Sequence, residues 1–120
     1  MFNFEKLETW HKAIAFADGV YGVTKSFPES ERFGLTSQLR RAAVSVSANI
    51  AEGSSRSSHL DFIRFLEIAT GSLFEVVSQL KIARNQNYLG EPDYLQLCST
   101  AEELVRMLSG LRKSLREPSA

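Results

Sequence analysis

Two groups of basic side chains are the residues whose types and spacing favour a binding chemistry. Arg40 and Arg41 are adjacent within an expected helix, and Arg112, Lys113 and Arg116 gather near the C-terminus. Guanidinium and ammonium groups bind phosphate oxygens, so either group could contact a polyanion with an affinity that falls as salt rises. Cations in a last helical turn also stabilise the helix dipole without any ligand, and this alternative stays open for the second group.

Residues that catalysis or metal binding would need are sparse. A carboxylate di-metal bundle requires a Glu-x-x-His pair on each of two helices, whereas Arg56 stands three residues before His59. The single cysteine, Cys98, has no spacing that pairs it with a histidine, and the sequence contains no Gly-x-Ser-x-Gly segment. We therefore expect no enzymatic activity, no metal site and no cofactor.

A third polar group precedes an expected turn. Asn49 and Glu52 flank Ile50 just before Gly53, and Arg56 follows four residues after Glu52. Buried or half-buried polar groups need hydrogen-bond partners, and a carboxylate pairs well with a guanidinium group. We predict that Asn49, Glu52 and Arg56 form a structural network in this turn rather than a binding site.

Composition is that of one globular domain. The chain has 120 residues, of which 43% are hydrophobic and 23% charged, enough for a single core without disulfides. Its formal charge is zero and its pI about 6.7, so bulk charge does not indicate a strongly basic nucleic-acid-binding protein. We expect no signal peptide, no membrane segment and, with one cysteine, a cytoplasmic location.

Hydrophobic spacing predicts an all-α fold, an antiparallel up-down-up-down four-helix bundle in which residues 1–120 form one domain. Apolar residues recur at intervals of three and four in segments 7–26, 30–53, 58–87 and 92–116. Phe27-Pro28 and Gly53 are expected to end the first two helices, and Ser30 and Ser58 to cap the second and third. Short connections join antiparallel neighbours, which gives the topology.

The same spacing predicts which side chains form the core. They are Leu7, Trp10, Ile14, Ala17, Tyr21 and Thr24; Leu35, Leu39, Ala42, Val46 and Ile50; Phe62, Leu66, Ala69, Leu73, Val76, Leu80 and Ala83; and Leu97 or Cys98, Ala101, Leu104, Leu108, Leu111 and Leu115. The stretch from Ala42 to Ala48 consists of small or β-branched residues, so it should be a seam where another helix approaches closely.

The third helix carries more apolar residues than one core face needs. At 100° per residue, Ile63, Thr70 and Phe74 align on a second stripe, away from the stripe centred on Leu73. A wide core or isolated exposed side chains would explain this stripe. Burial against another copy of the chain would also explain it, and we favour that interpretation, although periodicity does not give the number of subunits.

Several segments together resemble a known family. The run from Phe27-Pro28 through Glu31-Arg32-Phe33-Gly34 to Gln38-Leu39-Arg40-Arg41-Ala42-Ala43 leads into Asn49-Ile50-Ala51-Glu52-Gly53, and then to the Phe62–Leu80 segment. Almost the whole chain is similar to the four-helix-bundle family associated with intervening sequences of bacterial 23S ribosomal RNA genes. Some members of that family are accessory variability proteins of diversity-generating retroelements.

This resemblance implies a cytoplasmic bacterial protein that assembles as a homopentamer and whose function is poorly defined. In some relatives a basic barrel is similar to a platform that binds nucleic acid and reverse transcriptase. This chain departs from those relatives in having no net positive charge. We therefore hold two hypotheses. The first is a non-catalytic oligomeric adaptor whose helical surfaces bind RNA or a protein partner, with Arg40 and Arg41 as the side chains that contact a polyanion. The second is a structural or protein-interaction module with no nucleic-acid role.

Overall fold

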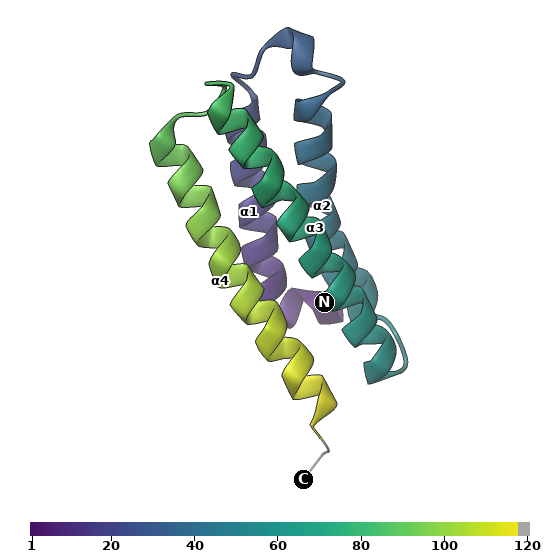
Figure 1. Cartoon of the computed structure of the whole chain (residues 1–120). Coiled ribbons are helices and arrows are strands. Elements are labelled where there is room, and N and C mark those ends of the chain that lie inside the picture. The colour runs from purple at the N-terminus through teal and green to yellow at the C-terminus, as the bar shows by residue number, and fades with distance from the viewer. Residues whose placement is uncertain (118–120) are drawn as a thin grey trace.

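A computed structural model describes residues 1–117 of the chain, and these residues form a bundle of four long helices (Figure 1). The helices are α1 (Glu8–Thr24), α2 (Leu35–Ser54), α3 (His59–Asn85) and α4 (Glu91–Arg116), with short 3-10 helices at Asn3–Lys6 and Glu29–Glu31. No strand occurs among the described residues. The all-α fold class predicted from the hydrophobic spacing is confirmed.

The helices pack around a single elongated core. Successive helices run antiparallel, α1 packs against α2 and α4, and α3 packs against the same two helices from the other side (Figure 1). The Cα positions extend over 52 × 23 × 22 Å. Short connections leave each helix beside its sequence neighbour, which produces the predicted up-down-up-down order.

The core consists mainly of the predicted side chains of α2, α3 and α4. Fully buried members include Leu39, Val46, Ile50, Leu66, Leu73, Leu80, Leu104 and Leu108, and Leu97 rather than half-buried Cys98 completes the first part of α4. On α1 the prediction is partly wrong, because the centre of the buried face is Ala13, Phe16 and Val20. Tyr21 is 40% exposed at the edge of that face.

Helix α2 begins five residues later than predicted, which corrects the assignment of Ser30 as its N-cap. Ser30 lies in the Glu29–Glu31 3-10 helix, and the chain turns before α2 starts at Leu35. The Glu31 carboxylate accepts a hydrogen bond from the Leu35 amide at 3.0 Å, so a side chain four residues upstream satisfies the helix end. Ser58 does cap α3 as predicted, because its Oγ accepts from the Asp61 amide at 3.1 Å.

Small residues form the predicted seam between α2 and α3. Ala42, Ala43 and Ser47 are buried, and Gly53 faces Phe62 and Phe65 of α3. A Cβ atom added at Gly53 would lie 2.8 Å from Phe65 Cβ and 2.9 Å from Phe62 Cδ1. Gly53 therefore permits close approach of the helices, whereas the sequence predicted it as a C-terminal stop; α2 continues to Ser54.

The second stripe predicted on α3 is not continuous. Ile63 is only 5% exposed within the single chain, so it is already buried and unavailable to another subunit. Thr70 is half-buried and donates its hydroxyl hydrogen bond to the Leu66 carbonyl at 2.9 Å. Phe74 is 57% exposed, and Ile68 and Ile82 on the same helix are each 49% exposed. At 100° per residue, Ile68 and Ile82 lie about 120° and about 80° around α3 from Phe74, and we call these three exposed residues together the α3 outer patch.

Candidate functional site

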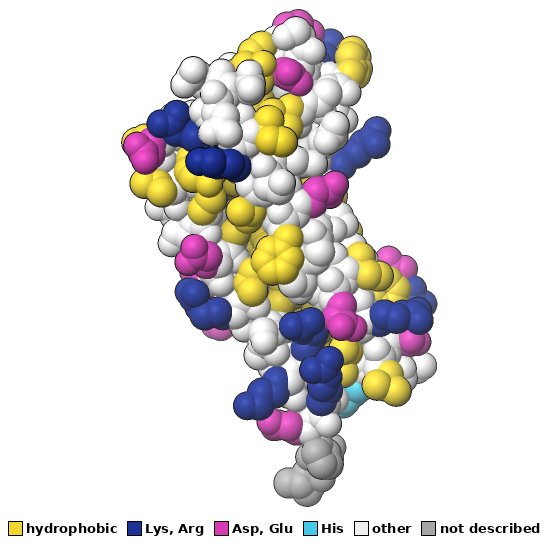
Figure 2. All heavy atoms as spheres, in the orientation of Figure 1, with side chains coloured by type: hydrophobic (Ala, Val, Ile, Leu, Met, Phe, Trp, Pro, Cys, Tyr) yellow, Lys and Arg dark blue, Asp and Glu magenta, His cyan; other side chains and the backbone are white. Residues whose placement is uncertain are grey.

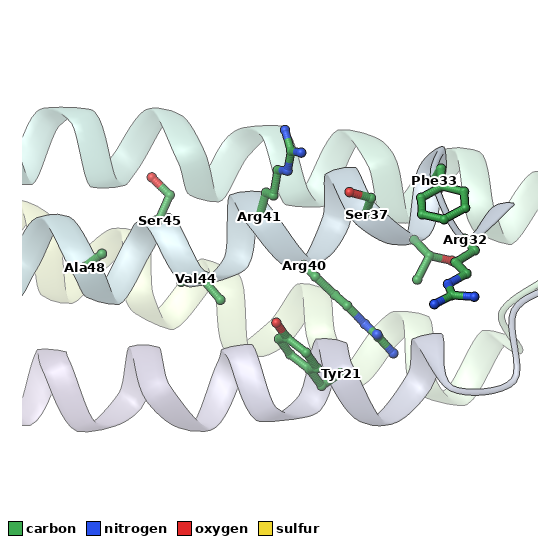
Figure 3. A pocket seen from close by; sticks show the side chains of 10 residues that line it. Tyr21, Arg32, Phe33, Ser37, Arg40, Arg41, Val44, Ser45 and Ala48 are labelled. Carbon is green, nitrogen blue, oxygen red and sulfur yellow. The ribbon is translucent and has the colours of Figure 1, made fainter.

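A surface hollow lies along the outer side of α2 where α2 meets α1 (Figure 3). It has a volume of about 710 Å³ and is lined by Tyr21, Arg32, Phe33, Thr36, Ser37, Arg40, Arg41, Val44, Ser45 and Ala48. We call it the α2 groove. Its floor is built of small or apolar side chains, and its cationic groups are all arginines. The predicted pair Arg40 and Arg41 thus lies at a surface depression rather than on a convex helix face.

Arg40 is held in place by residues of α1. Its Nε donates a hydrogen bond to Thr24 Oγ1 at 2.9 Å, and Thr24 Oγ1 donates to the Val20 carbonyl at 2.8 Å. The Arg40 guanidinium carbon lies 4.6 Å from the centre of the Tyr21 ring, a cation–π contact. These contacts leave further guanidinium N–H groups available while fixing the side chain, so ordering it on binding costs little entropy.

Arg41 is exposed and points to the other side of α2 from Arg40 (Figure 3). Among residues 1–117, neither arginine forms an ion pair with a carboxylate. Two arginines with no acidic partner therefore lie about a quarter-turn apart along one groove. Their side chains diverge on either side of α2 and do not converge on one point (Figure 3).

Two aromatic side chains of the groove were missed by the sequence reasoning. Phe33 is 88% exposed, with the Arg32 guanidinium carbon 5.2 Å from its ring centre, and Tyr21 had been assigned to the core. Arg32 also lies 3.5 Å from Glu29, in an exposed ion pair that contributes little energy. The signal available in the sequence is the Arg32-Phe33 dipeptide itself, which begins eight residues before Arg40.

The second basic group lies at the opposite end of the bundle, near the end of α4 (Figures 1 and 2). Arg112 is half-buried, with a side-chain nitrogen 4.0 Å from a Glu67 carboxylate oxygen of α3, and its Nε is buried without a hydrogen-bond partner. Lys113 and Arg116 are exposed in the last turns of the helix. Glu67 therefore reduces the positive charge of this group, whereas Arg40 and Arg41 have no acidic partner among residues 1–117.

Two of the three residues predicted to form the turn network contact each other. Arg56 and Glu52 form an ion pair at 2.7 Å, and the Arg56 guanidinium lies 4.7 Å from the Phe65 ring centre. Asn49 instead donates to the carbonyl and hydroxyl of Ser45, at 2.8 and 3.0 Å. Helical side chains lean toward the helix N-terminus, so Asn49 reaches one turn back rather than forward into the turn.

The two histidines contact backbone carbonyls rather than another side chain with catalytic chemistry. His11, which follows Glu8 by three residues, donates from Nε2 to the Glu5 carbonyl at 2.8 Å, and His59 Nδ1 lies 3.3 Å from the Leu115 carbonyl. A side-chain hydrogen bond with Cys98, with burial adding to it, raises the pKa of Tyr94. Within residues 1–117, no three histidine, cysteine or acidic side chains are grouped as metal ligands.

None of the helices in the described part of the chain is both long and apolar enough to span a membrane.

These features define a class of protein: an antiparallel four-helix bundle with a groove of arginine and aromatic side chains on its outer surface. The chain belongs to the family of 23S rRNA-intervening sequence proteins, whose pattern matches residues 5–110. No curated protein matches the sequence.

A solved structure supports the same assignment. The chain is similar to a protein of unknown function from the S23 ribosomal protein family of Bacteroides thetaiotaomicron VPI-5482, whose crystal structure was determined at 1.70 Å. The TM-score is 0.81 at 25% sequence identity, and the similarity covers 88% of this chain and 98% of that one. The family resemblance predicted from the sequence segments is therefore confirmed.

Proposed function

We propose that this protein is a non-catalytic, cytoplasmic adaptor that assembles from several copies, as a homopentamer, and binds single-stranded RNA through the α2 groove. The observation that carries the proposal is the combination of Arg40 and Arg41, which form no ion pair within residues 1–117, with the exposed rings of Phe33 and Tyr21. Arginine binds phosphate, and bases of any sequence stack on aromatic rings. One groove supplies both kinds of interaction.

Assembly would compensate for the zero net charge of the single chain. RNA affinity depends on the positive charge that several phosphates meet locally, rather than on the total charge of one subunit. A particle that repeats the α2 groove once per subunit would present many arginines to one strand. The intervening-sequence family name also connects the chain with ribosomal RNA genes, which is compatible with an RNA partner.

Arg41→Ala combined with Arg40→Ala is expected to weaken binding of a fluorescently labelled single-stranded RNA at low salt. Because the double variant can no longer neutralise two phosphates, the slope of log K against log salt should fall in magnitude by roughly 1.4, at about 0.7 per phosphate for single strands. Fluorescence anisotropy at several salt concentrations measures both quantities. Sedimentation of the variant must first show that its particle mass is unchanged.

The matched control is Arg106→Ala. Arg106 is an exposed arginine of α4 that forms no ion pair within residues 1–117 and does not line the α2 groove. It should leave the affinity and the salt slope unchanged. Equal affinities of the wild-type protein and the double variant would rule out the α2 groove. So would a weakening seen only with Lys113→Ala/Arg116→Ala.

Ile63 is buried within the chain, so the α3 outer patch is the apolar surface of α3 that remains exposed for self-assembly. Hydrophobic side chains form a band over the face that α3 and α4 present in Figure 2. Phe74→Glu would place a carboxylate in any interface formed by this patch, and burying an unpaired charge is costly. We expect analytical ultracentrifugation to show a smaller particle for Phe74→Glu.

Leu95→Glu is the control for this experiment, because Leu95 of α4 is also exposed, at 55%. It introduces the same charge outside the α3 outer patch and should leave the particle mass unchanged. An unchanged mass for Phe74→Glu would exclude the patch as the assembly surface, and would leave a protein that interacts with partners in some other way.

A further inference from the structure

A second, smaller hollow adjoins the α2 groove at the α1–α2 connection. It has a volume of about 280 Å³, and three residues spaced four apart, Arg32, Thr36 and Arg40, line both hollows. Lys25 and Glu29 also line the smaller one. The shared residues make the two hollows neighbouring parts of one surface.

Thr36 is the residue that points to a ligand. Its side chain belongs to a residue that is only 8% exposed, and its hydroxyl forms no hydrogen bond within residues 1–117. Threonine hydroxyls on helices commonly donate to a carbonyl one turn back, as Thr24 and Thr70 do in this bundle. Thr36 is largely buried as a residue, but its hydroxyl oxygen is not one of the fully buried unpartnered atoms of residues 1–117, so the hydroxyl opens to the hollow it lines and can donate to an acceptor supplied from outside.

The charged side chains around Thr36 favour a negatively charged group as the acceptor of its hydrogen bond. Lys25, Arg32 and Arg40 bring three cationic groups to the smaller hollow, and Glu29 brings one carboxylate. Glu29 and Arg32 are 86% and 66% exposed in their 3.5 Å ion pair, so this contact is largely screened by water. Glu31, which does not line the hollow, is engaged by the Leu35 amide and lies 3.4 Å from the Tyr88 hydroxyl.

We propose that the smaller hollow binds a phosphate group, with the Thr36 hydroxyl as hydrogen-bond donor and Arg32, Arg40 and Lys25 as the balancing charges. This deepens the proposed function and rests on it, because the phosphate is that of the RNA strand lying in the α2 groove. A base attached to that phosphate would reach Phe33 or Tyr21. Arg41 does not line the smaller hollow, so the two parts of the surface are experimentally separable.

Titration of the full-length protein with inorganic phosphate, followed by amide chemical shifts in NMR spectra, tests the site directly. The largest shifts are expected around Thr36, Arg32 and Lys25. Thr36→Val keeps the side-chain shape and removes the donor, and it should weaken phosphate binding about tenfold, as expected for a hydrogen bond to a charged group. Arg32→Gln, at an exposed position, should also weaken it without affecting folding.

Thr70→Val is the matched control, because its hydroxyl is bonded within α3 and lies outside both hollows. It should bind phosphate as the wild-type protein does. Unchanged phosphate affinity of Thr36→Val and of Arg32→Gln, or shifts confined to the end of α4, would overturn the site. If Thr36→Val does not fold, the Arg32→Gln result decides alone.

A parallel titration with a single-stranded RNA separates this site from the proposed function. RNA binding that depends on Arg41 but not on Thr36 would retain the RNA-binding function and overturn the phosphate site. Phosphate binding that depends on Thr36, in a protein that binds no RNA, would support the site and identify a free phosphate anion as its source. Weaker binding of both RNA and phosphate by Thr36→Val would support the site as the place where the RNA backbone is held.

Discussion

Gly53→Val is expected to destabilise the bundle by about 2 kcal/mol or more, because overpacking a close helix contact costs on the order of 1–3 kcal/mol. The added Cβ would lie 2.8 Å from Phe65 Cβ and 2.9 Å from Phe62 Cδ1, distances that require α2 and α3 to separate. Urea unfolding followed by circular dichroism should show a lower midpoint at an unchanged m-value.

Gly71→Ala provides the comparison at a glycine that packs against nothing. No heavy atom lies within 4 Å of a Cβ built at Gly71, an exposed position in the middle of α3. Alanine is favoured over glycine in a helix by about 0.5–1 kcal/mol, so this variant should be more stable than the wild type. If Gly53→Val were stabilising as well, Gly53 would have no packing role and the α2–α3 seam would be looser than the structure indicates.

The spacing of hydrophobic residues was sufficient to predict the fold, because the fold is determined mainly by which side chains are buried. In α3 the predicted core residues Leu66, Leu73 and Leu80 are spaced by seven and are each fully buried. Such spacing keeps side chains on one helix face wherever the partner helices lie. The face of α1 was harder to predict. Its apolar residues surround much of the helix, and only the neighbouring helices determine that Phe16 points inward and Tyr21 lies under Arg40.

The candidate site was only partly predictable, because it depends on contacts between segments. Arg40 and Arg41 could be identified as candidate phosphate-binding cations from their types and adjacency alone. The hydrogen bond from Arg40 to Thr24, and the hollow that contains Thr36, exist only after α1 and α2 are packed together. The same holds for Ile63, which periodicity assigned to an outer stripe but which the assembled bundle buries.

The start of α2 was mispredicted for a local reason. Ser30 and Glu31 have the residue types of a helix N-terminus, but the backbone turns again before Leu35. A capping signal identifies residues whose side chains can accept hydrogen bonds from the free amides at a helix start. Glu31 does accept such a bond, but from the amide of Leu35, four residues further along the chain. This displacement matters for function, since it leaves Arg32 and Phe33 in a turn at the mouth of the α2 groove instead of within a helix.

Leu73→Ala is expected to cause the largest loss of stability of any variant described above. Leu73 is fully buried in the middle of α3, and its replacement leaves a cavity that the surrounding helices fill only in part. Such substitutions cost about 2–5 kcal/mol, a large share of the roughly 5–15 kcal/mol that stabilises a typical domain. Thermal unfolding should shift downward by roughly 10 °C or more.

Leu60→Ala makes the same chemical change on the same helix, at a residue that is 79% exposed. Alanine is a slightly better helix former than leucine, and a surface substitution changes stability by only about 0.5 kcal/mol, so little effect is expected. The difference between the two variants therefore isolates burial from helix propensity. Equal destabilisation at Leu73 and Leu60 would mean that the stripe through Leu66, Leu73 and Leu80 does not hold the bundle together. The α2 groove would then have no rigid support beneath it.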